Sequence, residues 1–180
     1  MQKKRNNSSI KNKCKNIKII LTDVDGVLTD GGRYYSDKGE LLKKFHVRDG
    51  MGINILLRNG IKTIIVTKEN SKITKKWAKD MNITKVISGS LKKENELSKI
   101  CKKFKVTKNQ VAYIGDDVND LLLLKAVGFS ATPNDASDMI KEHVDYVCLK
   151  DGGRGAFREI SDMILKESSH IKWDFIRQIY

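Results

Sequence analysis

Short apolar runs alternate with longer segments of helical periodicity along most of the chain. The apolar runs are bounded by turn residues and predict strands at 17–21, 63–66, 85–87, 111–114, 129–131 and 146–149. The segments between them predict helices at 50–59, 71–81, 92–104, 117–126, 136–142 and 155–166. This alternation is typical of an α/β fold with a doubly wound parallel sheet, in which helices cover both faces.

Two of the predicted strands end in acidic residues. Asp23 and Asp25 follow the first strand, and Asp116 follows the strand at 111–114. Because side chains alternate along a strand, Asp23 and Asp25 are expected to face the same way. Anions this close repel each other and require a cation, and oxygen ligands suit Mg²⁺. Ligands of such sheets bind at the carboxyl ends of the strands, where these acids lie.

Residues 23–28 resemble the nucleophile motif D-x-D-G-[VT]-[LT] of the haloacid dehalogenase (HAD) phosphatase superfamily, and residues 115–120 resemble its fourth motif, G-D-D-x-x-D. The resemblance implies that Thr67 is the second motif and donates a hydrogen bond to a phosphate oxygen, although a strand-terminal threonine is also an ordinary helix N-cap. Lys93 matches the lysine of the third motif, and Lys92 is the competing candidate.

The same resemblance implies a mechanism. Asp23 attacks the phosphoryl group to form an aspartyl phosphate, and Asp25 serves first as general acid and then as general base. Mg²⁺ is held by the carboxylates of Asp23 and Asp116 and by the backbone carbonyl of Asp25. Asp117 and Asp120 orient the metal-bound waters and the lysine, with Asp120 as a direct ligand in the alternative arrangement.

Residues 31–46 predict a β-hairpin with its turn at 36–39, which is too short to form a separate cap domain. Together with K-x-F-x-x-R-D-G-x-G at 43–52 and G-G-x-G-x-x-R-E at 152–159, this segment resembles the 3-deoxy-D-manno-octulosonate (KDO) 8-phosphate phosphatases. The resemblance covers 17–165. It implies a homotetramer that assembles through the hairpins, so that neighbouring chains cap each active site.

Four residues are expected to contact the substrate by this resemblance. Arg48 and Asp49 are expected near it. Arg154 is a candidate partner for a sugar carboxylate because guanidinium binds carboxylates in a bidentate manner, although it can equally be part of a glycine-rich surface loop before a helix. Glu69 departs from the KDO 8-phosphate pattern and resembles enzymes acting on nine-carbon ulosonate 9-phosphates. The sequence therefore favours the eight-carbon substrate by family frequency and leaves the nine-carbon one open.

The net charge of +13 makes nucleic-acid binding a competing hypothesis. The excess comes from 28 Lys and only seven Arg, seven of these 35 cations lie in residues 1–18, and no nucleic-acid-binding motif is present. We therefore expect no nucleic-acid partner. A role as a non-catalytic assembly domain is disfavoured because all the catalytic residue types are in place.

Residues 17–166 are expected to form the enzyme domain, between a disordered basic tail at 1–16 and a C-terminal tail at 167–180 that can form a short helix. No run of 18 apolar residues predicts a membrane span. Cys14, Cys101 and Cys148 are scattered without metal-ligand spacing, which indicates free thiols in the reducing cytoplasm.

Overall fold

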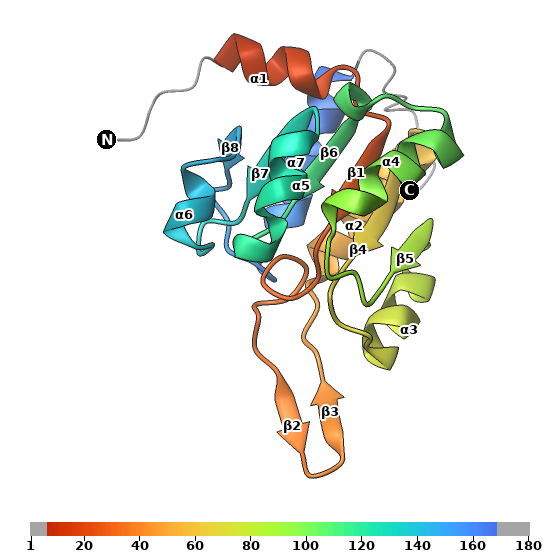
Figure 1. Cartoon of the computed structure of the whole chain (residues 1–180), viewed down its shortest axis with the longest axis vertical. Coiled ribbons are helices and arrows are strands. Elements are labelled where there is room, and N and C mark those ends of the chain that lie inside the picture. The colour runs from red at the N-terminus through yellow and green to blue at the C-terminus, as the bar shows by residue number, and fades with distance from the viewer. Residues whose placement is uncertain (1–6, 169–180) are drawn as a thin grey trace, which may run out of the picture.

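A computed structural model describes residues 7–168 of the chain (Figure 1). Its main sheet contains six parallel strands: β1 (Ile19–Thr22), β4 (Lys62–Val66), β5 (Lys85–Ile87), β6 (Val111–Ile114), β7 (Phe129–Thr132) and β8 (Tyr146–Val147). Their spatial order is β5-β4-β1-β6-β7-β8. The chain therefore builds outward from β1 on one side, then returns to add β6 on the other, which confirms the predicted doubly wound sheet.

Helices cover both faces of the sheet because alternate strand residues enter two separate apolar clusters. The first cluster contains residues of α1 (Asn7–Cys14), α2 (Val47–Arg58), α3 (Lys72–Asp80) and α7 (Ala156–Glu167). The second contains residues of α4 (Glu94–Phe104), α5 (Leu121–Ala126) and α6 (Asp138–Lys141). Two short 3-10 helices, η1 (Lys108–Gln110) and η2 (Val118–Asp120), flank β6.

A separate two-stranded hairpin of β2 (Tyr34–Ser36) and β3 (Gly39–Leu42) projects beyond the carboxyl end of β1 (Figure 1). This confirms the predicted insertion, although its paired strands are shorter than the 31–46 segment. Four large apolar side chains of the hairpin are at least half exposed: Tyr34, Tyr35, Leu41 and Leu42. Two segments outside the paired strands, 31–33 and 43–46, connect the hairpin to the rest of the fold; we call them its legs.

The expected disordered tail at 1–16 is wrong for the residues that the structure describes, because α1 packs against α7 and β7. Cys14 and Ile17 are buried and Ile10 packs on the first cluster. Lys13 forms an ion pair with Asp145 at 2.7 Å. The prediction failed because it relied on the basic composition of the segment. The apolar residues Ile10, Cys14 and Ile17, spaced four and three residues apart, are enough to pack the segment on the core.

Two helix boundaries differ from the prediction in ways that matter for the site. Helix α2 begins at Val47 instead of residue 50, because the His46 side chain caps it by accepting a hydrogen bond from the Arg48 amide. Arg48 and Asp49 thus lie in its first turn. Helix α4 begins at Glu94, after both candidate lysines.

No helix among residues 7–168 is both long and apolar enough to cross a lipid bilayer. The predicted C-terminal helix at 167–180 lies outside the described residues beyond Ser168. Trp77 is a packing residue, as its ring stacks on Phe45 with the centroids 4.2 Å apart.

We predict that Cys14 of the native protein does not react with a thiol reagent such as dithionitrobenzoate. Its side chain is fully buried, and burial raises the pKa of its thiol to about 12, which suppresses the reactive thiolate. Cys148 is also buried, so Cys101 should supply the native titre and unfolding should release all three thiols. A native titre that falls on Cys14→Ser substitution would show that the N-terminal segment is not docked.

Candidate active site

Asp23 is the first residue beyond β1 and is held from both sides. Its amide donates to the Ile114 carbonyl of β6 at 3.0 Å, which extends the strand pairing by one residue. Its Oδ1 accepts a hydrogen bond from the Val24 amide at 2.7 Å. The side chain is only 6% exposed, so this carboxylate is fixed at the carboxyl end of the sheet.

Gly26 turns the chain away from the strand with a φ of +87°, a conformation that residues with a Cβ rarely adopt. A Cβ built on Gly26 would lie 2.0 Å from Oδ2 of Asp116. The glycine is therefore needed twice, once for the turn and once because the Asp116 carboxylate occupies the space above it.

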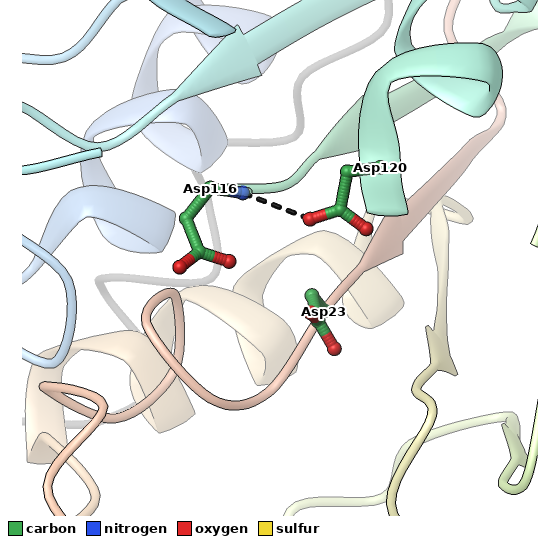
Figure 2. Close-up of side chains that lie close together, drawn as sticks. All are labelled: Asp23, Asp116 and Asp120. Atoms are coloured by element: carbon green, nitrogen blue, oxygen red, sulfur yellow. Dashed lines mark hydrogen bonds between the residues drawn. The ribbon is translucent and has the colours of Figure 1, made fainter. Parts of the chain in front are cut away.

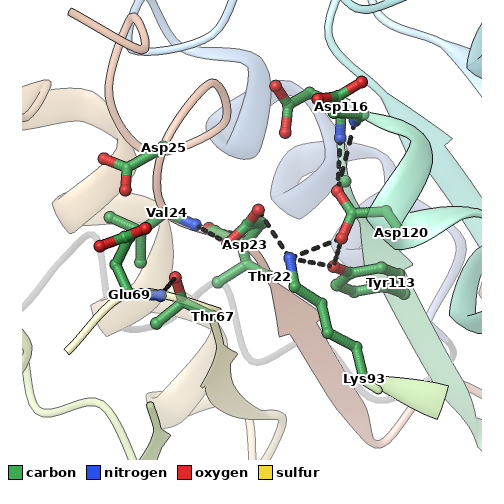
Figure 3. A network of polar contacts seen from close by, with 12 residues as sticks. Thr22, Asp23, Val24, Asp25, Thr67, Glu69, Lys93, Tyr113, Asp116 and Asp120 are labelled. Atoms are coloured by element: carbon green, nitrogen blue, oxygen red, sulfur yellow. Dashed lines mark hydrogen bonds and ion pairs between the residues drawn. The ribbon is translucent and has the colours of Figure 1, made fainter. Parts of the chain in front are cut away.

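Lys93 settles which of the two candidate lysines belongs to the site. Its side chain is buried, and its ammonium lies 2.7 Å from Oδ2 of Asp23 and 2.6 Å from Oδ1 of Asp120 (Figure 3). Lys92 is exposed. Burial by itself lowers the pKa of Lys93, but the two neighbouring carboxylates outweigh it and raise the pKa above its usual value.

Asp120 ties the β6 end of the site together. Its Oδ1 accepts hydrogen bonds from Lys93 and from the Tyr113 hydroxyl, and its Oδ2 accepts from the Asp116 amide at 2.9 Å and the Asp117 amide at 3.4 Å. Four bonds to one buried carboxylate support its predicted orienting role over that of a direct metal ligand. The Asp117 side chain instead caps η2.

Asp23, Asp116 and Asp120 form a cluster in which each carboxylate offers one oxygen, and these three oxygens lie within 4.8 Å of one another (Figure 2). Burial, followed by the charges of Asp23 and Asp120, raises the pKa of Asp116 to about 8. Burial also raises the pKa of Asp23, while Lys93 acts in the opposite direction. Three crowded carboxylates with one ammonium are an oxygen-only anionic donor set, which fits Mg²⁺ held by Asp23 and Asp116.

Thr67 lies directly after β4, next to β1, and is buried. Its Oγ1 accepts a hydrogen bond from the Glu69 amide at 3.3 Å, which still leaves its own O–H as a donor. The position suits the predicted contact with a phosphate oxygen. Its suggested alternative role as an N-cap is wrong, because Ser71 caps α3.

Asp25 does not join the carboxylate cluster, because β1 ends at Thr22 and strand alternation no longer applies at Asp25. Its side chain instead forms ion pairs with Lys43 and with Arg33, the latter at 3.0 Å. Figure 3 shows that the Asp25 carboxylate and Lys93 lie on opposite sides of Asp23. The expected metal contact through its backbone carbonyl stays a prediction.

Sequence reasoning missed Arg33 and Lys43 as site residues. Both lie in the legs of the hairpin, and Arg33 also contacts Glu69 at 3.4 Å. Glu69 is thus paired within the chain. The only sequence signal for either residue was that Lys43 is the first residue of the K-x-F-x-x-R-D-G-x-G segment. The sequence could not show its contact with Asp25, because that contact depends on how the hairpin folds back.

The structure gives Asp49 a role within the fold, while its contact with the substrate stays a prediction. Asp49 is fully buried, and its Oδ1 accepts a hydrogen bond from the Arg158 amide at 2.8 Å. Arg158 lies in the first turn of α7, whose own cap position is Gly155 and offers no side chain. Asp49 therefore caps a helix that lies more than 100 residues away in the sequence. Burial raises its pKa to about 6.

The loop before α7 packs tightly on the turn that follows Asp25. The Gly153 amide donates to the Val27 carbonyl at 2.9 Å. A Cβ on Gly152 would lie 2.0 Å from the Gly26 carbonyl oxygen, so only glycine permits this approach. Arg154 is exposed on this loop, and Arg48 is exposed on α2. Their substrate contacts stay predictions.

Comparison with known proteins yields a consistent set of relatives. A family model described as haloacid dehalogenase-like hydrolase matches residues 58–160. The KDO 8-phosphate phosphatase of Haemophilus influenzae is 45% identical over 154 residues, which cover 86% of each chain. The corresponding phosphatase of Escherichia coli K12 is 38% identical over 153 residues, 85% of this chain and 81% of the relative.

Solved structures show the same likeness. The KDO 8-phosphate phosphatase of Moraxella catarrhalis, in complex with magnesium, phosphate and KDO, has a TM-score of 0.91 at 34% identity and covers 97% of this chain and 100% of its own. The cobalt-bound phosphatase of Haemophilus influenzae has a TM-score of 0.84 at 44% identity, covering 86% and 91%.

We predict that Asp49→Ala destabilises the protein more at pH 4 than at pH 7. Because the folded-state pKa of about 6 exceeds the ordinary aspartate pKa of 3.8, the folded protein binds the proton more tightly than the unfolded chain does. The contribution of Asp49 to stability therefore falls as pH rises through 6. The difference should reach about 1–3 kcal/mol in urea unfolding, on top of about 1 kcal/mol for the lost cap.

Asp162→Ala is the matched control, since Asp162 pairs with the side chain of Arg158 on the exposed side of α7, and its removal should cost less than about 1 kcal/mol. A larger effect of Asp49→Ala at pH 7 than at pH 4 would mean that the hydrogen bonds to the helix outweigh burial.

Proposed function

We propose that this chain, which belongs to the haloacid dehalogenase-like hydrolases, is a Mg²⁺-dependent phosphatase that hydrolyses the phosphate monoester of a 3-deoxy-2-ulosonate sugar acid, namely KDO 8-phosphate. One observation carries the proposal. A buried lysine joins Asp23, at the end of β1, to Asp120, just beyond the adjacent β6, at the switch point of the sheet.

In the first step, an oxygen of Asp23 attacks phosphorus and the bond from phosphorus to the sugar oxygen breaks. Asp25 gives its proton to the departing alkoxide, so that the sugar leaves as an alcohol. Lys93 and the Thr67 hydroxyl offset the charge that gathers near the phosphoryl oxygens. The products are the sugar acid with a free hydroxyl group and an aspartyl phosphate on Asp23.

In the second step, water attacks the phosphorus of this intermediate, and the phosphorus–oxygen bond to Asp23 breaks. Asp25, now a carboxylate, takes a proton from the water, which returns it to its starting state. Inorganic phosphate leaves and Asp23 is regenerated. Mg²⁺ bound by Asp23 and Asp116 would neutralise phosphoryl charge throughout the reaction.

The substrate assignment rests on the relatives, which are named as KDO 8-phosphate phosphatases and share up to 45% identity with this chain. Glu69 supports the nine-carbon alternative, an N-acylneuraminate or KDN 9-phosphate. Its ion pair with Arg33 weakens that support, because a carboxylate already neutralised by its own chain is less available to a sugar hydroxyl.

We further propose that the chain forms a homotetramer in which neighbouring subunits cap each active site, and the hairpin supports this. Its two tyrosines and two leucines expose apolar side chains on a two-stranded element, and such isolated hairpins are marginally stable in water. We also propose a cytoplasmic location, which three free cysteines support, and a role in lipopolysaccharide sugar synthesis if the eight-carbon substrate holds.

To test the activity, we would measure phosphate release with Mg²⁺ from KDO 8-phosphate and from KDN and N-acetylneuraminate 9-phosphates. We expect the highest kcat/KM for KDO 8-phosphate and loss of all activity on chelation of the metal. The blank is Asp23→Asn, which removes the nucleophile and keeps the side-chain volume.

A preference for a nine-carbon substrate would make Glu69 the determinant of specificity, and Glu69→Arg should then reverse the order. If the wild type released no more phosphate than Asp23→Asn from any of the three esters, the phosphatase assignment would be wrong.

We predict a mass of four chains of 20.4 kDa each by light scattering. Tyr35→Lys with Leu41→Lys should lower this mass, because charges replace exposed apolar side chains of the hairpin. Leu149→Lys should not lower it, although Leu149, which lies outside the hairpin, is even more exposed than Leu41. A monomeric wild type would contradict the tetramer.

A further inference from the structure

The base of the hairpin brings two cations to Asp25, one from each leg. Arg33 precedes β2 and contacts Oδ2 of Asp25 at 3.0 Å. Lys43 follows β3 and contacts Oδ1. The carboxylate assigned to proton transfer is thus held at both oxygens by an element that lies outside the main sheet.

The two cations differ in how firmly they are held. The side chain of Lys43 is fully buried, whereas that of Arg33 is 30% exposed and is shared with Glu69 at 3.4 Å. The ammonium of Lys43 also lies 3.1 Å from Oε1 of Glu40, which gives it a second carboxylate partner besides Asp25.

Glu40 is anchored in turn by the main body of the fold. Its Oε2 accepts a hydrogen bond from the Ser71 hydroxyl, and the same Ser71 oxygen caps α3 by accepting from the Thr74 amide at 3.3 Å. The contacts therefore run without a break from the capped end of α3 through Glu40 and Lys43 to Asp25. Removing Lys43 would leave two carboxylates facing an unfilled, buried position.

We propose that Lys43 is a positioning residue for Asp25, which fixes Oδ1 so that Oδ2 is the oxygen that exchanges the proton with the leaving group and the water. The inference rests on the proposed phosphatase function and adds an intrachain role to the hairpin. Oδ2 is suited to the exchange because its partner, Arg33, is partly exposed and has Glu69 as a second partner.

The chemistry of the leaving group gives a specific readout. An alkoxide such as that of KDO 8-phosphate departs slowly unless it is protonated, whereas p-nitrophenolate departs readily without a proton. Because kcat/KM reports the steps up to release of the alcohol or phenol, a misplaced Asp25 lowers it for the alkyl ester and leaves it nearly intact for the aryl ester.

The experiment compares kcat/KM for KDO 8-phosphate and p-nitrophenyl phosphate in wild type and Lys43→Met. We expect a fall of roughly 10- to 100-fold for the alkyl ester and less than about threefold for the aryl ester. Lys44→Met is the matched control, since Lys44 is the next residue, is more than half exposed and pairs with Asp30; both rates should stay within about twofold of wild type.

A double-mutant cycle tests whether Lys43 acts through Asp25. In an Asp25→Asn background, Lys43→Met should change either rate by less than about threefold, because the group that it positions no longer carries a proton. Glu40→Gln keeps the lysine but removes its second anchor, so it should show the same selective loss at smaller size, and it decides the question if Lys43→Met does not fold.

Equal losses for both esters, no loss for either, or a full further loss in the Asp25→Asn background would each overturn the proposed role of Lys43. If the wild type hydrolyses neither ester, the proposed phosphatase function fails instead, so the two failures are distinguishable.

Discussion

The buried contact of Lys93 with Asp23 and Asp120 is the interaction on which the rest of the site depends. Parallel strands β1 and β6 end side by side, so their terminal acids converge at one edge of the sheet. Without a cation, carboxylates this close cannot all remain ionised in a buried setting. The lysine supplies a permanent charge there, and the capacity for a divalent cation follows from the remaining excess of negative charge.

This constraint also explains local structure that helical propensity does not. Lys93 has helical backbone angles and occupies the N-cap position of α4, which begins at Glu94. Its side chain does not cap the helix and is directed into the site. Tyr113 would otherwise be an ordinary strand residue of the second cluster, but its hydroxyl donates to Asp120. Lys93, at the start of a helix, and Tyr113, in a core strand, thus both hold the Asp120 carboxylate in place.

On the other side of Asp23, the structure depends on the close approach of two backbone segments. Gly152 and Gly153 pack directly on the turn after Asp25, and the helix that follows them is capped by Asp49 from α2. The turn is thus held by the loop before α7, and the first leg of the hairpin, 31–33, starts from this fixed turn. The hairpin has two distinct parts: a charged base that contacts Asp25 and a pair of strands that expose four large apolar side chains.

By itself, the sequence determined the order of strands and helices and the residues at the strand ends, because both follow from local periodicity. Asp23, Thr67 and Asp116 were predictable, since each directly follows or nearly follows an apolar run whose neighbours in the sheet are set by the α/β alternation. The motifs carried by these residues are contiguous, so no long-range contact was needed to identify them.

Only the tertiary structure decided which partners these residues have. The choice of Lys93 over Lys92 depends on the direction of one side chain at the start of α4, and the capping role of Asp49 depends on α2 meeting α7. The contacts of Arg33 and Lys43 with Asp25 depend on how the hairpin folds back. Ion pairs and caps between distant segments are fixed by packing, and no periodicity in the sequence records them.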